Sequence, residues 1–109
     1  MELSKKDKKI ARQIIEKGLQ KEYAQGLFEA DTVLHNWKNK TLGNREAYLS
    51  LYKKIMNCDK HIARRYNNMT GSKYLFIIAG QLLDGVISDS DLTEFSEEVI
   101  KAINLIADR

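Results

Sequence analysis

"YLFIIAGQLLDG", residues 74–85, decides the fold that we predict for this chain of 109 residues. On a helix its first ten residues are apolar nearly all round, with large or aliphatic side chains at Tyr74, Leu75, Phe76, Ile77, Ile78, Ala79, Leu82 and Leu83. A helix without a polar face is buried centrally and is not amphipathic. We therefore predict a third helix, from Lys73 to about Asp84, at the centre of a helical bundle.

The first third of the chain predicts one long helix that begins after Ser4. Ser4 and Asp7 have the spacing of a capping box. Apolar residues then recur at helical spacing to about Asn39, and seven of them share one face: Ile15, Leu19, Tyr23, Ala30, Val33, Leu34 and Trp37. Gly18 and Gly26 each weaken a helix by about 1 kcal/mol relative to alanine. The helix is therefore either continuous, at about 50 Å, or kinked near one of these glycines.

A second helix is predicted from Arg45 to about Met69. The preceding "TLGN" offers Gly43 as the left-handed residue after a helix and Asn44 as the next N-cap. A later "TGS", with Gly71 as the stop, should end the second helix. Its apolar stripe is the cleanest in the chain: Tyr48, Leu51, Tyr52, Ile55, Ile62, Tyr66 and Met69.

A fourth helix is predicted from about Asp91 to Ala107, with five apolar residues on one face: Leu92, Phe95, Val99, Ile103 and Ile106. The first two helices form a long hairpin, whereas the third and fourth are shorter. The predicted fold class is all-α: an antiparallel helical bundle of about four helices with a long first hairpin, in a single domain over residues 1–109.

The turn that begins at Asp84 resembles the second half of an EF-hand calcium loop. Asp84 and Gly85 match its acid–glycine turn, and Asp91 falls where the closing acid belongs. Counting back, the two earlier ligand positions fall on Gly80 and Leu82, which have no side-chain oxygen. A hard cation needs several oxygens at once, so we expect a helix boundary here and no calcium.

The composition is that of a soluble globular protein, with 43% hydrophobic and 30% charged residues and a net charge of +3. The start is hydrophilic, and the longest apolar run, "YLFIIAG", is far too short to span a bilayer. The single cysteine, Cys58, cannot form an internal disulfide and is expected to pack inertly. We expect a cytoplasmic protein without a membrane partner, of the general character of a small bacterial helical protein.

Asp59 is the most unusual single residue of the second helix. Its spacing places it inside the apolar stripe, between Ile55 and Ile62, and a buried carboxylate must be paired, hydrogen-bonded or protonated. We therefore expect a buried polar site in which Asp59 meets tyrosine hydroxyls, with Tyr23, Tyr66 and Tyr74 as the candidates. The carboxylate is either structural, bonded to a tyrosine hydroxyl or to a basic neighbour, which we favour, or a functional group.

Basic residues also gather on the second helix. Lys53, Lys60 and Arg64 line one strip of it, and Arg65 lies on the next. Such a face could bind phosphate groups, although a solvated basic face is the simpler interpretation. The fourth helix, which a helix-turn-helix unit would place in the major groove, is acidic, and this argues against DNA binding of that kind.

Metal and acid–base chemistry are not indicated. The two histidines, His35 and His61, would lie roughly 20 Å apart in an antiparallel hairpin. The single cysteine provides no thiolate cluster, and the Glu-x-x-His pairs of di-iron bundles are absent from the sequence. We expect no catalytic residue, no metal and no cofactor.

These observations favour a non-enzymatic protein-interaction or oligomerisation module. The first hairpin is longer than the helices that can cover it, so part of its apolar stripe should lack cover within one chain. An exposed stripe of that kind usually marks an interface. The expected partner is a second copy, in a homodimer, or another protein. The alternative is a nucleic-acid or polyanion binder that uses the basic face of the second helix.

Overall fold

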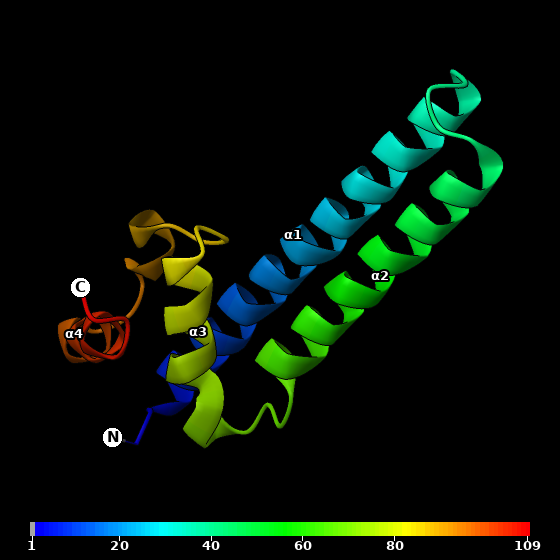
Figure 1. Ribbon diagram of the computed structural model, residues 1–109. Helices are drawn as coiled ribbons and strands as arrows, with labels where there is room; N and C mark the ends of the chain where they lie inside the picture. Colours follow the sequence, from blue (N-terminus) through cyan, green and yellow to red (C-terminus); the bar gives the residue numbers. More distant parts are fainter. Residues whose placement is uncertain (1) are drawn as a thin grey trace.

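Residues 2–109, which the computed structural model describes, form four α-helices and no strand (Figure 1). The helices are α1 (Lys5–Lys38), α2 (Asn44–Tyr66), α3 (Tyr74–Leu83) and α4 (Glu97–Ile106), and two short 3-10 turns, η1 (Gly71–Lys73) and η2 (Asp89–Leu92), precede α3 and α4. The helices α1 and α2 run antiparallel as a long hairpin. Its base is the end where α1 begins and α2 finishes, and only there does α3 pack against it (Figure 1). The predicted all-α bundle with a long first hairpin is confirmed.

The first helix is continuous over 34 residues, and Figure 1 shows it straight. Ser4 caps its start, because the backbone N–H of Asp7 donates to Ser4 Oγ at 3.0 Å. At 1.5 Å per residue α1 is about 51 Å long, close to the longest dimension of the molecule, 53 Å. The prediction of one long helix is correct, and its alternative, a kink near a glycine, does not occur.

Gly18 and Gly26 mark the two places where another helix comes unusually close to α1. A Cβ atom at Gly18 would lie 2.2 Å from Nε2 of Gln81 in α3, and one at Gly26 would lie 2.6 Å from Sγ of Cys58 in α2. Both distances are far shorter than any ordinary van der Waals contact. Glycine costs the helix about 1 kcal/mol at each position, and the close approach of the neighbouring helices offsets that cost.

The hydrophobic core lies at the base of the hairpin, between the first half of α1, α3 and α4. Ile78 of α3, Leu92 of η2 and Ile103 of α4 are the large apolar side chains with the least exposure. The third helix is therefore central, as predicted, except along one edge where Phe76 and Leu83 face solvent. The core ends before the outer half of the hairpin begins.

The predicted start of the fourth helix at Asp91 is wrong. The helix begins at Glu97, after Ser96, whose Oγ accepts from the backbone N–H of Val99 at 3.4 Å. Asp91 instead closes a capping box with Ser88 across the short turn η2. Two caps, Ser88 and Ser96, therefore follow each other within this segment.

The residues that end the helices also differ from prediction. Of the three glycines near predicted helix ends, Gly43, Gly71 and Gly85, only Gly85 has a left-handed backbone, with φ of 72°. After α1 that conformation falls on Lys40, with φ of 63°, and after α2 on Asn68, with φ of 55°. The turn at Asn68 ends α2 three residues earlier than predicted. Gly43 and Gly71 lie instead at the starts of the next helical segments.

Replacing Gly18 with alanine should lower the free energy of unfolding by about 1–3 kcal/mol, the usual cost of overpacking. The added methyl group would press on Gln81, which is fully buried. Gly80→Ala in α3 is the matched control, because its nearest neighbour would be Arg65 Nε at 3.7 Å, an ordinary contact. Urea denaturation should find that control at least as stable as the wild type, since alanine favours a helix. Equal stability of the two variants would contradict the packing role of Gly18.

Candidate functional site

A hydrogen-bonded network of polar side chains joins α1, α2 and α3 where the three helices meet. Gln81 of α3 is fully buried, and its Nε2 donates to the carbonyl of Ile15 at 3.1 Å and to the hydroxyl of Tyr66 at 2.9 Å. Tyr66 in turn donates to Glu22. Nε2 thus uses both of its hydrogens, whereas Oε1 of Gln81 is buried without a partner among the described residues.

Glu22 is the centre of charge in this network. Its side chain is only 10% exposed, and its Oε1 lies 2.7 Å from both Arg65 Nη1 and His61 Nε2. Its other oxygen accepts from Tyr66, and Arg65 also pairs with Asp84 at the end of α3. A buried carboxylate needs donors of this kind to offset its lost hydration. Glu22 therefore ties the end of α2 to α1, and Arg65 extends the connection to α3.

Two side chains beside Glu22 hold their protons more tightly than usual. Burial, and then the hydrogen bond to Glu22, raise the pKa of Tyr66 from 10.0 to about 12. Burial also raises the pKa of the Cys58 thiol, and the nearby carboxylates, Glu29 first, act in the same direction. Since the thiolate is the nucleophilic form of cysteine, Cys58 is a poor nucleophile at neutral pH. Its contact with Gly26 fits the packing role expected from the sequence.

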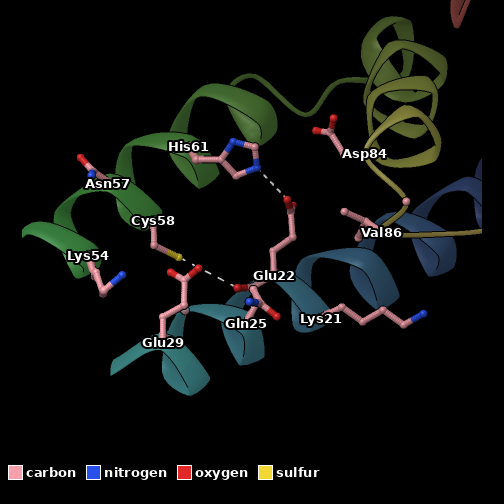
Figure 2. Close-up of a pocket in the computed structure, with 12 residues that line it drawn as sticks. Lys21, Glu22, Gln25, Glu29, Lys54, Asn57, Cys58, His61, Asp84 and Val86 are labelled. Carbon is pink, nitrogen blue, oxygen red and sulfur yellow. Dashed lines mark hydrogen bonds and ion pairs between the residues drawn. The ribbon is translucent and has the colours of Figure 1, made fainter. Parts of the chain in front are cut away.

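An open cleft of about 690 Å³ lies beside the network, between α1, α2 and the turn after α3 (Figure 2). Its walls carry side chains of both charges and several amides, among them Lys21, Gln25, Glu29, Lys54 and Asn57. No three His, Cys, Asp or Glu side chains are grouped for a metal in the part of the chain that the structure describes. Glu22, which lines the cleft, is bonded to Arg65 and His61. The arrangement holds the three helices together.

The buried polar site predicted around Asp59 does not form. Asp59 is exposed, and Tyr23 is exposed on α1. Tyr66 and Tyr74 are buried, but Tyr66 donates to Glu22 and Tyr74 belongs to the hydrophobic core. The expected burial of Asp59 is wrong because, among the described residues, no other helix covers the side of α2 on which Asp59 lies. The apolar stripe of α2, which was predicted to face the core, is exposed to solvent in this part of the helix.

Two residues on which the polar network depends, Glu22 and Gln81, were not predicted from the sequence. Gln81 carries a recognisable signal, because it is the one amide in an otherwise apolar α3 and a buried amide needs hydrogen-bond partners. Glu22 lies midway between Gly18 and Gly26, on the strip of α1 where its neighbours come closest. A polar residue between two close-packed glycines is the signal that could have found it.

The predicted anion-binding face is only partly available. Lys53, Lys60 and Arg64 are exposed on α2. The side chain of Arg65 is 11% exposed, and its guanidinium is bonded to two carboxylates of the network. Arg65 therefore belongs to the structural network and leaves three basic side chains on this face.

One surface of the outer hairpin carries large apolar side chains that are exposed to solvent. We call this set of residues the apolar face; it consists of Tyr23, Leu27 and Leu34 of α1 and Tyr48, Leu49, Tyr52, Ile55 and Met56 of α2. Large contiguous apolar patches are uncommon on monomeric proteins and mark interaction sites.

Helix geometry places both groups of the apolar face on the same side of the hairpin. In α1 the buried Ala30 and Val33 face α2, and in α2 the buried Ala47 faces α1. At 100° per residue, the apolar face lies about 50–90° from the mean direction of Ala30 and Val33 on α1 and about 80–200° from Ala47 on α2, in the same rotational sense on each helix. Because the helices are antiparallel, that sense leads to one side of the pair. Gly18, which contacts α3, lies in the opposite sense, so α3 occupies the other side.

A groove near the tip of the hairpin continues the apolar face. Its volume is about 290 Å³, and its lining is almost entirely apolar: Leu34, Trp37, Asn44, Ala47, Tyr48 and Leu51. The indole Nε1 of Trp37 donates to Asn44 Oδ1 at 2.8 Å, which satisfies its one polar group. The tryptophan is nevertheless exposed, so burying the rest of its ring against a partner would be favourable.

Comparisons of the chain with models of known protein families, with curated proteins and with solved structures found no match. Within residues 2–109, every helix is too short or too polar to cross a membrane. Function is therefore inferred from the two surfaces described above, the polar cleft and the apolar face.

The free energy of unfolding should fall between pH 10 and pH 12 by about 2 kcal/mol more for the wild type than for Tyr66→Phe. Folded Tyr66 keeps its proton until its pKa of about 12, whereas tyrosine in the unfolded chain releases it near 10. The unfolded state thus binds fewer protons over this range, and stability decreases as the pH rises. Urea unfolding of both proteins at several pH values measures the difference. Parallel pH profiles would contradict the buried bond from Tyr66 to Glu22.

Proposed function

We propose that this protein is a non-enzymatic interaction module that associates through its apolar face, with a second copy of itself as the occupant. The supporting observation is the exposure of eight large apolar side chains, between 36% and 71%, on one side of the hairpin. Single exposed apolar residues are normal on protein surfaces, but a group of this size is typical of an interface.

The energetics of the outer hairpin also support association. Beyond Gly26, the buried apolar residues of its two helices are small: Ala30, Val33 and Ala47. The larger side chains point outward, so one chain alone recovers little hydrophobic free energy there. A second hairpin laid on the apolar face would complete a four-helix arrangement. Each Å² of apolar surface that it buried would contribute about 25 cal/mol.

Polyanion binding through the second helix has less support. Binding of phosphate groups depends on several free cations on one surface, and Arg65 is held by Glu22 and Asp84. Lys53, Lys60 and Arg64 are left to form such a face.

Sedimentation velocity at tens of micromolar should show a dimer for the wild type and a shift to monomer for the double variant Leu27→Lys, Tyr52→Lys. The two lysines would have to lose water on entering a buried interface, which is costly, so we expect the dissociation constant to rise at least tenfold.

The matched control is Gln25→Lys, Asn57→Lys, which adds the same charge on the opposite, polar side of the same two helices. It should dimerise like the wild type, with the helical circular dichroism of all three proteins alike. A wild type that stays monomeric, or a control that dissociates as readily as the apolar-face variant, would overturn the proposal.

A further inference from the structure

The apolar residues of α2 are arranged symmetrically about Tyr52. Leu49 and Ile55 lie three residues before and after it, and Tyr48 and Met56 lie four residues before and after it. All five are exposed. Residues spaced by three, four and seven share one face of a helix. Large apolar residues therefore occur at the same distances from Tyr52 toward either end of α2.

Opposite charges end this symmetric stripe. Arg45 lies seven residues before Tyr52 and Asp59 seven residues after it, and both are exposed. Neither takes part in the ion pairs found among residues 2–109. Seven residues are close to two turns, so both charges lie on the face of Tyr52, about 21 Å apart. The size pattern is symmetric about Tyr52, whereas the charge pattern reverses.

We propose that two copies of the chain associate by antiparallel pairing of their α2 helices, with the twofold axis at Tyr52. Asp59 of each copy then forms an ion pair with Arg45 of the other. This geometry rests on the proposed function, because it specifies how the apolar face is covered.

The charges select the antiparallel direction. With a twofold axis that crosses α2 at Tyr52, a residue a given number of positions before Tyr52 in one copy faces the residue the same number of positions after Tyr52 in the other copy. Tyr48 of one copy then meets Met56 of the other, and Leu49 meets Ile55. Sulfur and an aromatic ring attract each other in such a pair. A parallel pairing of α2 would instead place arginine beside arginine and aspartate beside aspartate, an arrangement that like-charge repulsion disfavours.

The first helix fits the same axis. Gly26 packs on Cys58, so the α1 residue level with Tyr52, six residues along each helix, is Thr32. Rotation about that level brings Leu27 of one copy toward Trp37 of the other. The hydrophobic cores then lie at opposite ends of the dimer. Since α3 occupies the side of the hairpin away from the apolar face, the cores do not block the contact.

Charge reversal tests this geometry. Asp59→Arg and Arg45→Asp should each weaken self-association at least tenfold, because each replaces both ion pairs of the twofold dimer by like-charge contacts. Mixing the two variants should restore wild-type affinity as a heterodimer, since the arginine introduced at position 59 faces the aspartate introduced at position 45, and the unchanged Arg45 of one variant faces the unchanged Asp59 of the other. Native mass spectrometry separates the heterodimer from the homodimers by mass. The double variant Asp59→Arg, Arg45→Asp should dimerise as the wild type does.

Glu29→Arg is the matched control, because it reverses an acid at the polar cleft on the other side of the hairpin. It should dimerise normally and show no preference for the Arg45→Asp variant. A dimeric wild type whose charge variants dimerise unchanged, without preference in the mixture, would overturn the antiparallel register and leave the proposed function standing. A monomeric wild type would overturn both.

Discussion

The length of α3 is the constraint on which the rest of the structure depends. Its 10 residues cover about 15 Å, whereas the 34 residues of α1 extend for about 51 Å. The core lies at the base of the hairpin, which is the part that α3 covers. There the absence of a side chain at Gly18 leaves room for Gln81 to pack directly against α1. The outer hairpin has no third helix to cover it. Its buried residues are therefore small, and its large apolar side chains face solvent.

The polar network fixes the long hairpin in place relative to the hydrophobic core. Glu22 of α1 accepts hydrogen bonds from Arg65 and Tyr66 of α2. Tyr66 in turn accepts from Gln81 of α3, and Arg65 also donates to Asp84 at the end of α3. Because the polar groups beside the cleft are bonded to one another, their role there is to hold the three helices together. A firmly held hairpin presents the apolar face as a fixed surface, and a fixed surface pays a smaller entropy cost on association.

Helical periodicity was sufficient to predict the long first helix and the central third helix, because both depend on local spacing alone. It could not separate a stripe that faces a core from one that faces a partner, since both have the same pattern. Asp59 was therefore expected inside and is found outside. The start of the fourth helix was misplaced because Ser96 offered a second cap inside an unbroken apolar pattern. From the sequence alone, Gly18 and Gly26 indicate only a weaker helix, because their role depends on the helices that pack on them.

An intermolecular distance measurement tests the central claim, antiparallel pairing of the hairpin with a second copy, most directly. A spin label at Ala63, in a Cys58→Ala background, would sit on an exposed position of α2, eleven residues from Tyr52. Pulsed electron paramagnetic resonance on the singly labelled protein should give a separation of about 33 Å between the two copies, twice eleven residues at 1.5 Å each. A separation below about 20 Å, as expected for parallel helices packed side by side, or the absence of any intermolecular distance, would contradict it.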